Sequence, residues 1–235
     1  MSTREDTPRV GVVIAAAGSS TRYGGAAFKQ LEDLNGSPLY LHSVKAALNT
    51  PGITHVVIVV PIGHAAAFEE AKRLQGGHSR ITIVQGGALR RDSVYLGLLK
   101  LRDLGMDYAL VHDAARAFVT EEIIIDVMEA TIEFGAAIAA IPVVDTLKIV
   151  SDGVIDATIP RESLWRAQTP QGASLEVLLE AYHAAITQDF NATDEASVLE
   201  HAGVAVHVVL GDESNFKVTY PEDLERARGG MFENG

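Results

Sequence analysis

The chain alternates short apolar runs with longer segments of helical pattern, and this alternation constrains its fold more than any other feature. The runs are rich in Val, Ile and Ala, and they cover residues 10–14, 54–60, 80–84, 107–111 and 136–141. Continuous β-branched runs are typical of strands that are covered on both faces. The segments between them are long enough for helical crossovers, which join parallel strands. The sequence therefore predicts an α/β, Rossmann-like, doubly wound and mostly parallel sheet.

The predicted helices are recognised by their start signals and by the turns that close them. Ser37 is a candidate N-cap with Pro38 in the first turn, Asp92 or Ser93 opens another helix, and Thr120 caps a third. These patterns predict helices over 38–48, 63–74, 92–103 and 120–134.

After Pro142 the alternation stops. Residues 146–150 and 154–159 flank a Ser-Asp-Gly turn, which predicts a β-hairpin with no helix to cover it. A protruding hairpin of this kind favours contacts between subunits, so we expect a dimerisation arm at about 142–163. The remaining predicted elements are a short strand at 164–168, helices at 175–187 and 194–201 (capped by Thr193), a strand at 204–210 and a terminal helix from Pro221.

Length and charge narrow the class of protein. The 235 residues suit one domain, which we place at 9–228 with flexible tails at 1–8 and 229–235. The formal net charge of −12 argues against nucleic acid as the main partner, although local cations can still bind a small phosphorylated substrate. The chain has no cysteine, which excludes disulfides, thiolate zinc sites and cysteine nucleophiles.

Targeting signals are also lacking. No apolar run reaches the roughly 18 residues of a membrane span, and the first eight residues are polar. We therefore expect a cytoplasmic protein with no membrane partner.

A turn-rich loop with small residues follows the first predicted strand. It contains Gly18 and two cations, Arg22 and Lys29. Small residues let backbone amides approach a phosphate closely, and the cations add full charges. The spacing is neither that of a P-loop nor that of the dinucleotide fingerprint. Composition alone would favour a surface loop without a ligand, but the position after the first strand favours a triphosphate site.

Chemistry-bearing residues follow several of the predicted strands. In a doubly wound sheet, ligands bind outside the carboxyl ends of the strands. We therefore expect the following segments at one edge: the Gly18 loop, Gly86-Gly87, the run from His112 to Arg116, Thr146, and residues 212–217.

Several of these residues also have ordinary structural interpretations. Asp113 could cap a helix or pair with Arg116, or it could orient a hydroxyl or a metal shell while Arg116 holds a phosphate. His112 is expected to pack behind the site rather than act as a base. Asp194-Glu195 is expected to serve a helix macrodipole. The eight histidines show no metal-ligand spacing.

The predicted site lacks a convincing nucleophile. A second substrate that carries its own phosphate would supply an ionised nucleophile, and no protein base would be needed. The protein would then align two substrates and neutralise the charge on the transferring phosphoryl group. The cations for such a scheme are Arg22, Lys29, Arg116 and Lys217.

A set of motifs occurs together and in order along the chain. They are residues 15–22 with Lys29-Gln30, Gly86-Gly87 with residues 92–94, residues 112–116, 145–148, 168–171, 193–196 and 215–219. This set resembles the 2-C-methyl-D-erythritol 4-phosphate cytidylyltransferases of the methylerythritol phosphate route to isoprenoids. The resemblance covers roughly residues 9–228. It implies a nucleotidyltransferase that uses Mg²⁺, joins CTP and methylerythritol 4-phosphate, and releases pyrophosphate. It also implies a homodimer.

The resemblance also implies roles for individual residues. The catalytic cations would be Arg22, Lys29 and Lys217. The residues implied to bind the nucleotide are Ala16, Ala17, Gly18, Gly87, Arg90 and Ser93. Those implied to bind the sugar phosphate are Asp113, Arg116, Thr146, Thr169, Thr193 and Arg161, the last donated by the neighbouring subunit. The resemblance assigns no protein ligand to the metal, which would be held mainly by the CTP phosphates.

The chain departs from the family's pattern at three places, and other functions remain open. Ala88 stands where an acidic residue is common, Ala117 where proline is usual, and Gly172-Ala173 where an aromatic often occurs. None of these removes a charged group that the chemistry needs. The nearest alternative is a cytidylyltransferase for another polyol phosphate such as ribitol 5-phosphate. A non-catalytic nucleotide-binding regulator is disfavoured by the retention of both Arg22 and Lys29, and a dehydrogenase by the missing glycine fingerprint.

Overall fold

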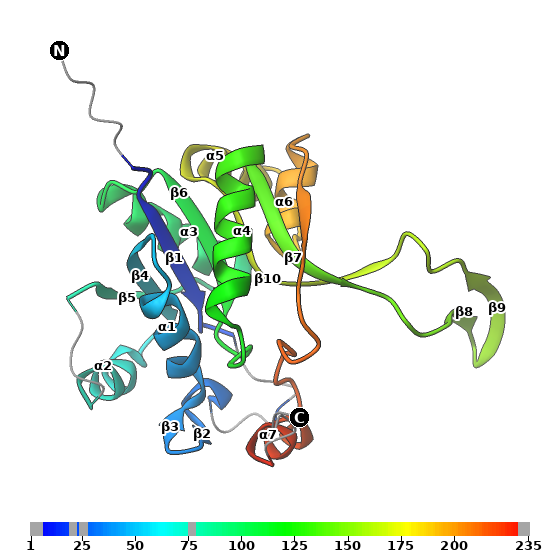
Figure 1. Cartoon of the computed structure of the whole chain (residues 1–235), viewed down its shortest axis with the longest axis horizontal. Coiled ribbons are helices and arrows are strands. Elements are labelled where there is room, and N and C mark those ends of the chain that lie inside the picture. The colour runs from blue at the N-terminus through cyan, green and yellow to red at the C-terminus, as the bar shows by residue number, and fades with distance from the viewer. Residues whose placement is uncertain (1–6, 19–22, 24–27, 75–78, 230–235) are drawn as a thin grey trace.

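A seven-stranded sheet forms the centre of the molecule (Figure 1). The computed structural model describes residues 7–18, 23, 28–74 and 79–229. The strands of this sheet lie in the order β11-β7-β10-β6-β1-β4-β5. Their bounds are β1 Val10–Ala15, β4 Ile53–Val60, β5 Ile81–Gln85, β6 Tyr108–Asp113, β7 Ala136–Pro142, β10 Trp165–Ser174 and β11 His207–Leu210.

Six of the seven strands run in the same direction, which confirms the mostly parallel sheet. β1 pairs in parallel with β4 and β6, β4 with β5, and β11 with β7. Only β10 is antiparallel to its neighbours β6 and β7. The strand predicted at 164–168 is longer than expected, because β10 continues to Ser174 in the interior of the sheet.

Helices cover both faces of the sheet, as a doubly wound fold requires. Their bounds are α1 Leu39–Asn49, α2 Ala65–Leu74, α3 Arg90–Asp103, α4 Glu121–Phe134, α5 Leu175–Thr187, α6 Glu195–His201 and α7 Pro221–Arg228. Successive residues of a strand point to opposite faces, so Val12 and Val13 belong to different cores. The core that contains Val12 also contains side chains of α1, α2 and α4, and the core that contains Val13 contains side chains of α3, α5 and α6.

Four predicted helix starts, those of α1, α2, α3 and α6, are wrong by one or two residues. Ser37 and Pro38 form the short strand β3 (Ser37–Pro38), which pairs with β2 (Asp33–Leu34), and the helix follows. A short 3-10 helix, η2 (Lys29–Leu31), precedes them. Helix α3 begins at Arg90, before the predicted start. Asp194, not Thr193, caps α6, because its side chain accepts the Ser197 backbone N–H. The predicted Thr120 cap of α4 is correct.

The predicted hairpin is present and extends away from the body of the molecule (Figure 1). Its strands are β8 Leu147–Ser151 and β9 Val154–Ile159. Asp152 and Gly153 join them with φ angles of 49° and 80°, values that Asp-Gly provides in a two-residue hairpin turn. Apolar side chains on the arm, including Val154 and Ile155, are exposed.

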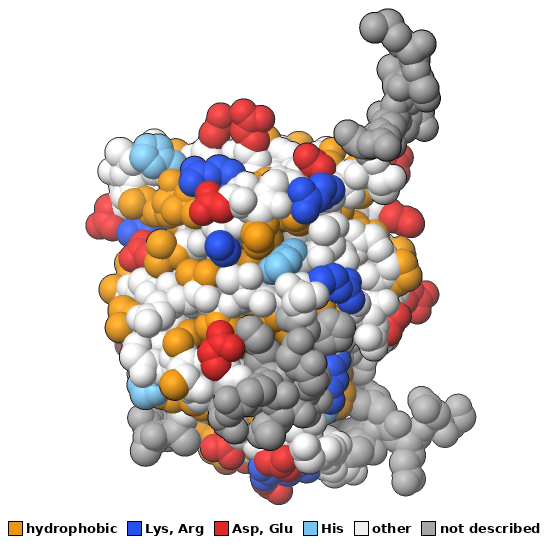
Figure 2. Space-filling model, turned by 90° about the vertical axis from the view of Figure 1, so that its left-hand side faces the viewer, with side chains coloured by type: hydrophobic (Ala, Val, Ile, Leu, Met, Phe, Trp, Pro, Cys, Tyr) orange, Lys and Arg blue, Asp and Glu red, His pale blue; other side chains and the backbone are white. Residues whose placement is uncertain are grey.

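On the face opposite the arm, acidic and basic side chains are interspersed among apolar ones (Figure 2). No helix within the described residues is both long and apolar enough to cross a bilayer. The single-domain limits stay a prediction, and most of the proposed tails lies outside the described residues.

Candidate active site

A cavity of about 350 Å³ opens at the carboxyl edge of the sheet. It lies beside the ends of β1, β5 and β6, where the topology predicts a ligand site. Its lining includes eight of the residues predicted to act in the site, namely Ala17, Gly18, Lys29, Gly87, Arg90, Ser93, Asp113 and Lys217. It also includes Tyr23, Gln30 and Leu89, for which the sequence suggested no role.

A second, smaller cavity of about 190 Å³ adjoins the first. Its lining includes three residues that were predicted to bind the sugar phosphate, namely Arg116, Thr169 and Thr193. The residues common to both cavities are Arg90, Asp113 and Lys217. Two molecules bound in the two cavities would therefore meet at one wall of three charged side chains.

The shared wall is a chain of ion pairs. Asp113 accepts a hydrogen bond from Lys217 Nζ at 2.7 Å, and its other oxygen accepts one from Arg90 Nη2 at 3.3 Å. Arg90 also donates to both oxygens of Glu195, at 2.8 and 3.2 Å. Tyr182 donates its hydroxyl to Glu195 at 2.8 Å. Opposite charges therefore alternate along the wall.

Glu195 thus has a different role from the one expected. It stands in the first turn of α6, but its side chain is fully buried and binds Arg90. The macrodipole interpretation is therefore incomplete for Glu195, which does stand in the first turn but also pairs with Arg90, while Asp194 caps the helix. A carboxylate in a first turn normally faces solvent, so only the three-dimensional approach of Arg90 reveals its partner.

The cations of the wall keep Asp113 ionised. Burial alone would raise the pKa of Asp113, but Arg90 and Lys217 hold that pKa well below its ordinary value. Burial alone would lower the pKa of Arg90, but Glu195 and Asp113 raise it above its ordinary value. The Asp113 carboxylate and the Arg90 guanidinium therefore stay charged at neutral pH.

His112 packs behind the site, as the sequence suggested. Its Nδ1 lies 2.9 Å from Thr169 Oγ1 and its Nε2 lies 3.1 Å from the Arg116 carbonyl oxygen. A carbonyl can only accept, so Nε2 carries the proton and Thr169 donates to Nδ1. Burial lowers the pKa of His112 to about 4. The ring is therefore neutral and buried, unsuited to act as a base on substrate.

The ion pair between Arg116 and Asp113, one of the interpretations open from the sequence, does not form. The Arg116 guanidinium donates to the carbonyl oxygens of Asn215, at 2.7 Å, and Ala167, at 3.3 Å. Burial lowers the pKa of Arg116, and the nearby Asp113 partly opposes that shift. Arg116 remains a cation on the wall of the second cavity.

The nucleotide-side residues are held by local hydrogen bonds. Lys29 Nζ donates to the Val218 carbonyl oxygen at 2.8 Å, which ties the first loop to the last one. Ser93 Oγ accepts the Gly87 backbone N–H at 3.1 Å and donates to the Leu89 carbonyl oxygen at 2.9 Å. The double-glycine turn is therefore fixed against the start of α3.

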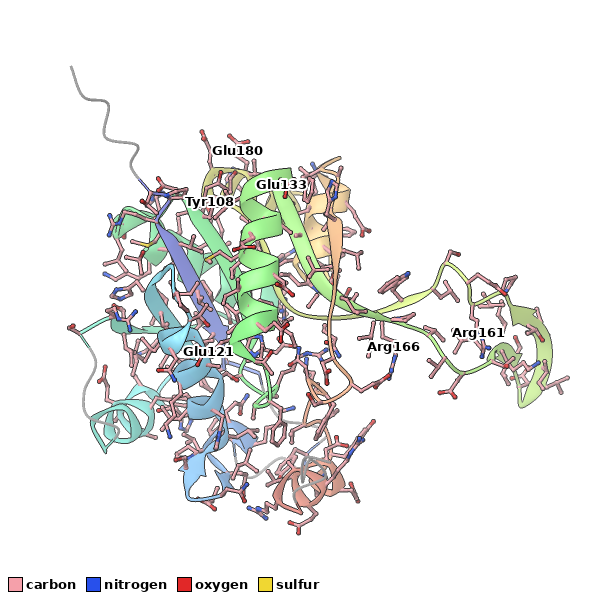
Figure 3. All side chains as sticks on the ribbon, viewed as in Figure 1. Tyr108, Glu121, Glu133, Arg161, Arg166 and Glu180 are labelled. Atoms are coloured by element: carbon pink, nitrogen blue, oxygen red, sulfur yellow. The ribbon has the colours of Figure 1, made fainter. Side chains whose placement is uncertain are left out.

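Some predicted site residues are placed elsewhere. Arg22 lies outside the described residues. Ala16 is fully buried in the core and does not line the cavity. Thr146 and Arg161 are exposed on the arm, far from both cavities in this chain, and Figure 3 shows Arg161 there. No group of three or more His, Cys, Asp or Glu side chains within the described ranges could hold a metal ion.

Comparison with known proteins identifies the family. The family model described as "2-C-methyl-D-erythritol 4-phosphate cytidylyltransferase" (IspD) matches residues 10–232. The chain belongs to this family. An IspD enzyme from Bacillus mycoides is 39% identical over 213 residues, which cover 91% of this chain and 93% of that one.

Solved structures of IspD enzymes have the same fold. The structure from Francisella tularensis has a TM-score of 0.80 and 30% identity, and the alignment covers 95% of this chain and all of that one. The structure from Anaerococcus prevotii has a TM-score of 0.83 and 25% identity, with 96% and 97% coverage. These comparisons confirm the predicted fold class and the predicted activity, a CTP-dependent cytidylyltransferase of the non-mevalonate pathway.

Proposed function

We propose that cytidylyl transfer takes place at the wall shared by the two cavities, with CTP in the larger and 2-C-methyl-D-erythritol 4-phosphate in the smaller. The observation that carries this proposal is that Arg90, Asp113 and Lys217 line both cavities. Two substrates bound on either side of these residues would bring their phosphates together. Lys217, whose side chain is partly exposed, is placed to contact both.

The reaction would proceed by attack of one phosphate on another. An oxygen of the sugar phosphate forms a bond to the α-phosphorus of CTP, and the bond from that phosphorus to the bridging β-oxygen breaks. The bonding electron pair leaves with pyrophosphate. A phosphate monoester is already mostly ionised at neutral pH, so no protein group has to remove a proton.

In this scheme the protein acts through charge and alignment. Lys29 and Arg22 neutralise the triphosphate, and Lys217 stabilises the charge that develops on the transferred phosphoryl group. Arg116 binds the sugar phosphate from the second cavity. Ser93 and the Gly87 backbone hold the nucleoside side of CTP.

Mg²⁺ fits this donor set as an ion carried by CTP. The carboxylate on the shared wall, Asp113, already has two cationic partners, so its charge is largely compensated. Phosphate oxygens are the preferred ligands of Mg²⁺ beside one or two carboxylates. When bound, the ion would neutralise triphosphate charge and orient the leaving pyrophosphate.

The functional unit is proposed to be a homodimer. Thr146 and Arg161 lie on the arm and line neither cavity of their own chain. The apolar side chains Ile149, Val154 and Ile155 on the same arm are exposed. Docking of two arms would bury these side chains and bring Arg161 to the partner's sugar-phosphate cavity. Location in the cytoplasm, and the absence of nucleic-acid and membrane partners, stay predictions from the sequence.

Product formation tests the proposal. The chain is incubated with CTP, Mg²⁺ and either methylerythritol 4-phosphate or the dephosphorylated polyol, and pyrophosphate release is followed. Release should occur only with the phosphorylated substrate. Transfer to the unphosphorylated alcohol would require a protein base and would overturn the scheme.

A further inference from the structure

We propose that Gln168 is a positioning residue that fixes Lys217 at the wall between the two cavities. The proposal rests on the role proposed above for Lys217. Gln168 stands on β10, the strand that runs against the direction of the rest of the sheet. Its amide reaches the loop that leads from β11 to Lys217.

The Gln168 side-chain amide forms a donor and an acceptor hydrogen bond with the backbone of Asp212, as the backbone of a neighbouring strand would. Nε2 donates to the Asp212 carbonyl oxygen at 2.7 Å, and Oε1 accepts the Asp212 backbone N–H at 3.3 Å. Oε1 also accepts from Asn215 Nδ2 at 3.2 Å, so both of its lone pairs are used. Gln168 is only 3% exposed, and a buried amide loses free energy if such partners are removed.

Asn215 extends this hydrogen-bond network toward Lys217. Asn215 is fully buried, and its Nδ2 also donates to the Thr169 carbonyl oxygen at 2.9 Å. On the other side of Lys217, the Val218 backbone N–H donates to the Ala115 carbonyl oxygen at 2.9 Å. The backbone of Lys217 therefore lies between two anchored residues, and from this fixed base its ammonium reaches Asp113.

Gly211 shows how closely Gln168 approaches the loop. A Cβ atom on Gly211 would lie 2.3 Å from Gln168 Oε1, closer than such atoms can come. The backbone of Gly211 has no positive φ that would call for glycine. The requirement for glycine here therefore comes from the Gln168 amide, which three hydrogen bonds hold in place.

Gln171 offers a matched control three residues along the same strand. It is 1% exposed, and its amide is as fully engaged as that of Gln168. Its Nε2 donates to Asp194 Oδ2 at 3.0 Å, and its Oε1 accepts the Ala196 backbone N–H at 2.8 Å. Its Nε2 also donates to the Gln168 carbonyl oxygen at 3.0 Å, which involves the backbone of Gln168 and not its amide side chain. The Gln171 side chain therefore fixes the start of α6 and forms no hydrogen bond with residues 211–217.

The test is a double-mutant cycle with Lys217→Ala. Misplacing a catalytic group by about 1 Å can lower the rate about 100-fold, so Gln168→Ala should lower kcat by about 10- to 100-fold. In the Lys217→Ala background the same change should lower kcat by less than about twofold, because the group it positions is gone. Gln171→Ala should have the same effect in both backgrounds. The melting temperature of each variant is recorded beside its kcat and KM.

Gly211→Ala reaches the same contact from the loop side and serves if Gln168→Ala does not fold. It should reduce kcat like Gln168→Ala, and the double variant should be no worse than either single one. An equal loss from Gln168→Ala with and without Lys217 would show a merely structural role and overturn the inference. Full activity of Lys217→Ala would instead remove the proposed role of Lys217, and this inference with it.

Discussion

Lys217 Nζ donates to Asp113 Oδ2 across 2.7 Å, although the two residues are 104 positions apart in the sequence. This contact joins the loop after the last strand to the end of β6. It places a cation at the border of two cavities, where the phosphates of two substrates would meet. The chemistry proposed for this chain depends on that position.

Replacing Lys29 should mainly affect the chemical step. Lys29→Ala should lower kcat by about 10²–10³, the effect of losing one preorganised donor for developing charge. The KM for CTP should change far less. Lys100→Ala, on α3 and outside both cavities, is the control and should behave as wild type. Steady-state kinetics with varied CTP separates the two parameters, and a loss found wholly in the KM would reduce Lys29 to a binding residue.

Replacing Arg90 should destabilise the fold through Glu195. Arg90→Gln leaves a fully buried carboxylate without its counter-ion, which should lower the free energy of unfolding by about 3–5 kcal/mol. Adding Glu195→Gln removes the uncompensated charge and should restore more than half of the loss. Urea unfolding of the single and double variants measures this. Equal free energies of unfolding for the single and the double variant would show that the buried Glu195 carboxylate does not depend on Arg90 as its counter-ion.

The buried His112 should make the fold less stable in acid. Its pKa is about 4 when folded against an ordinary value of 6.5, so the unfolded chain takes up a proton first as the pH falls. The free energy of unfolding should therefore decrease between pH 6.5 and about 4, by on the order of 3 kcal/mol from this group. Above pH 6.5, His112 should contribute no pH dependence to the free energy of unfolding.

The comparison with His112→Gln isolates this contribution. Asp113 also loses stabilisation in acid, because its folded pKa is depressed, but that loss remains in the variant. Urea unfolding at several pH values should show a shallower acid slope for His112→Gln than for wild type. The exposed His183→Gln is the control and should keep the wild-type slope. Identical slopes for all three proteins would contradict a buried neutral His112.

Mixed dimers test whether Arg161 acts in the partner's site. Lys29→Ala and Arg161→Ala homodimers should each be nearly inactive. A mixed dimer would combine an intact Lys29 from one chain with an intact Arg161 from the other, and activity should return in one of its two sites. If Arg161 acts within its own chain, every site carries one lesion, so no recovery despite confirmed subunit exchange would reject the shared site.

Much of the fold could be predicted from the sequence because the central parallel strands β1, β4 and β6 are largely buried on both faces. Residues 56–60 are all Val or Ile, and such a pattern leaves few alternatives. β10 could not be predicted in the same way, since Gln168, Pro170 and Gln171 do not resemble a buried strand. Its glutamines are buried only because the loop before Lys217 and the start of α6 satisfy their amides.

The candidate site could be predicted where residues follow strand ends. Lys29, Gly87, Asp113 and Lys217 meet at one edge because the carboxyl ends of parallel strands lie together. Glu195 was missed, since its only sequence signal, a carboxylate at a helix start, has an ordinary explanation. Its pairing with Arg90, 105 positions away, follows from tertiary packing alone.

The identity of the product tests the central claim most directly. Equal amounts of methylerythritol 4-phosphate and ribitol 5-phosphate are offered together with limiting CTP and Mg²⁺, and the products are resolved by mass spectrometry. We expect 4-diphosphocytidyl-2-C-methyl-D-erythritol as the dominant product, with pyrophosphate in equal amount. A dominant cytidylyl derivative of ribitol, or the absence of any cytidylyl product, would contradict the account.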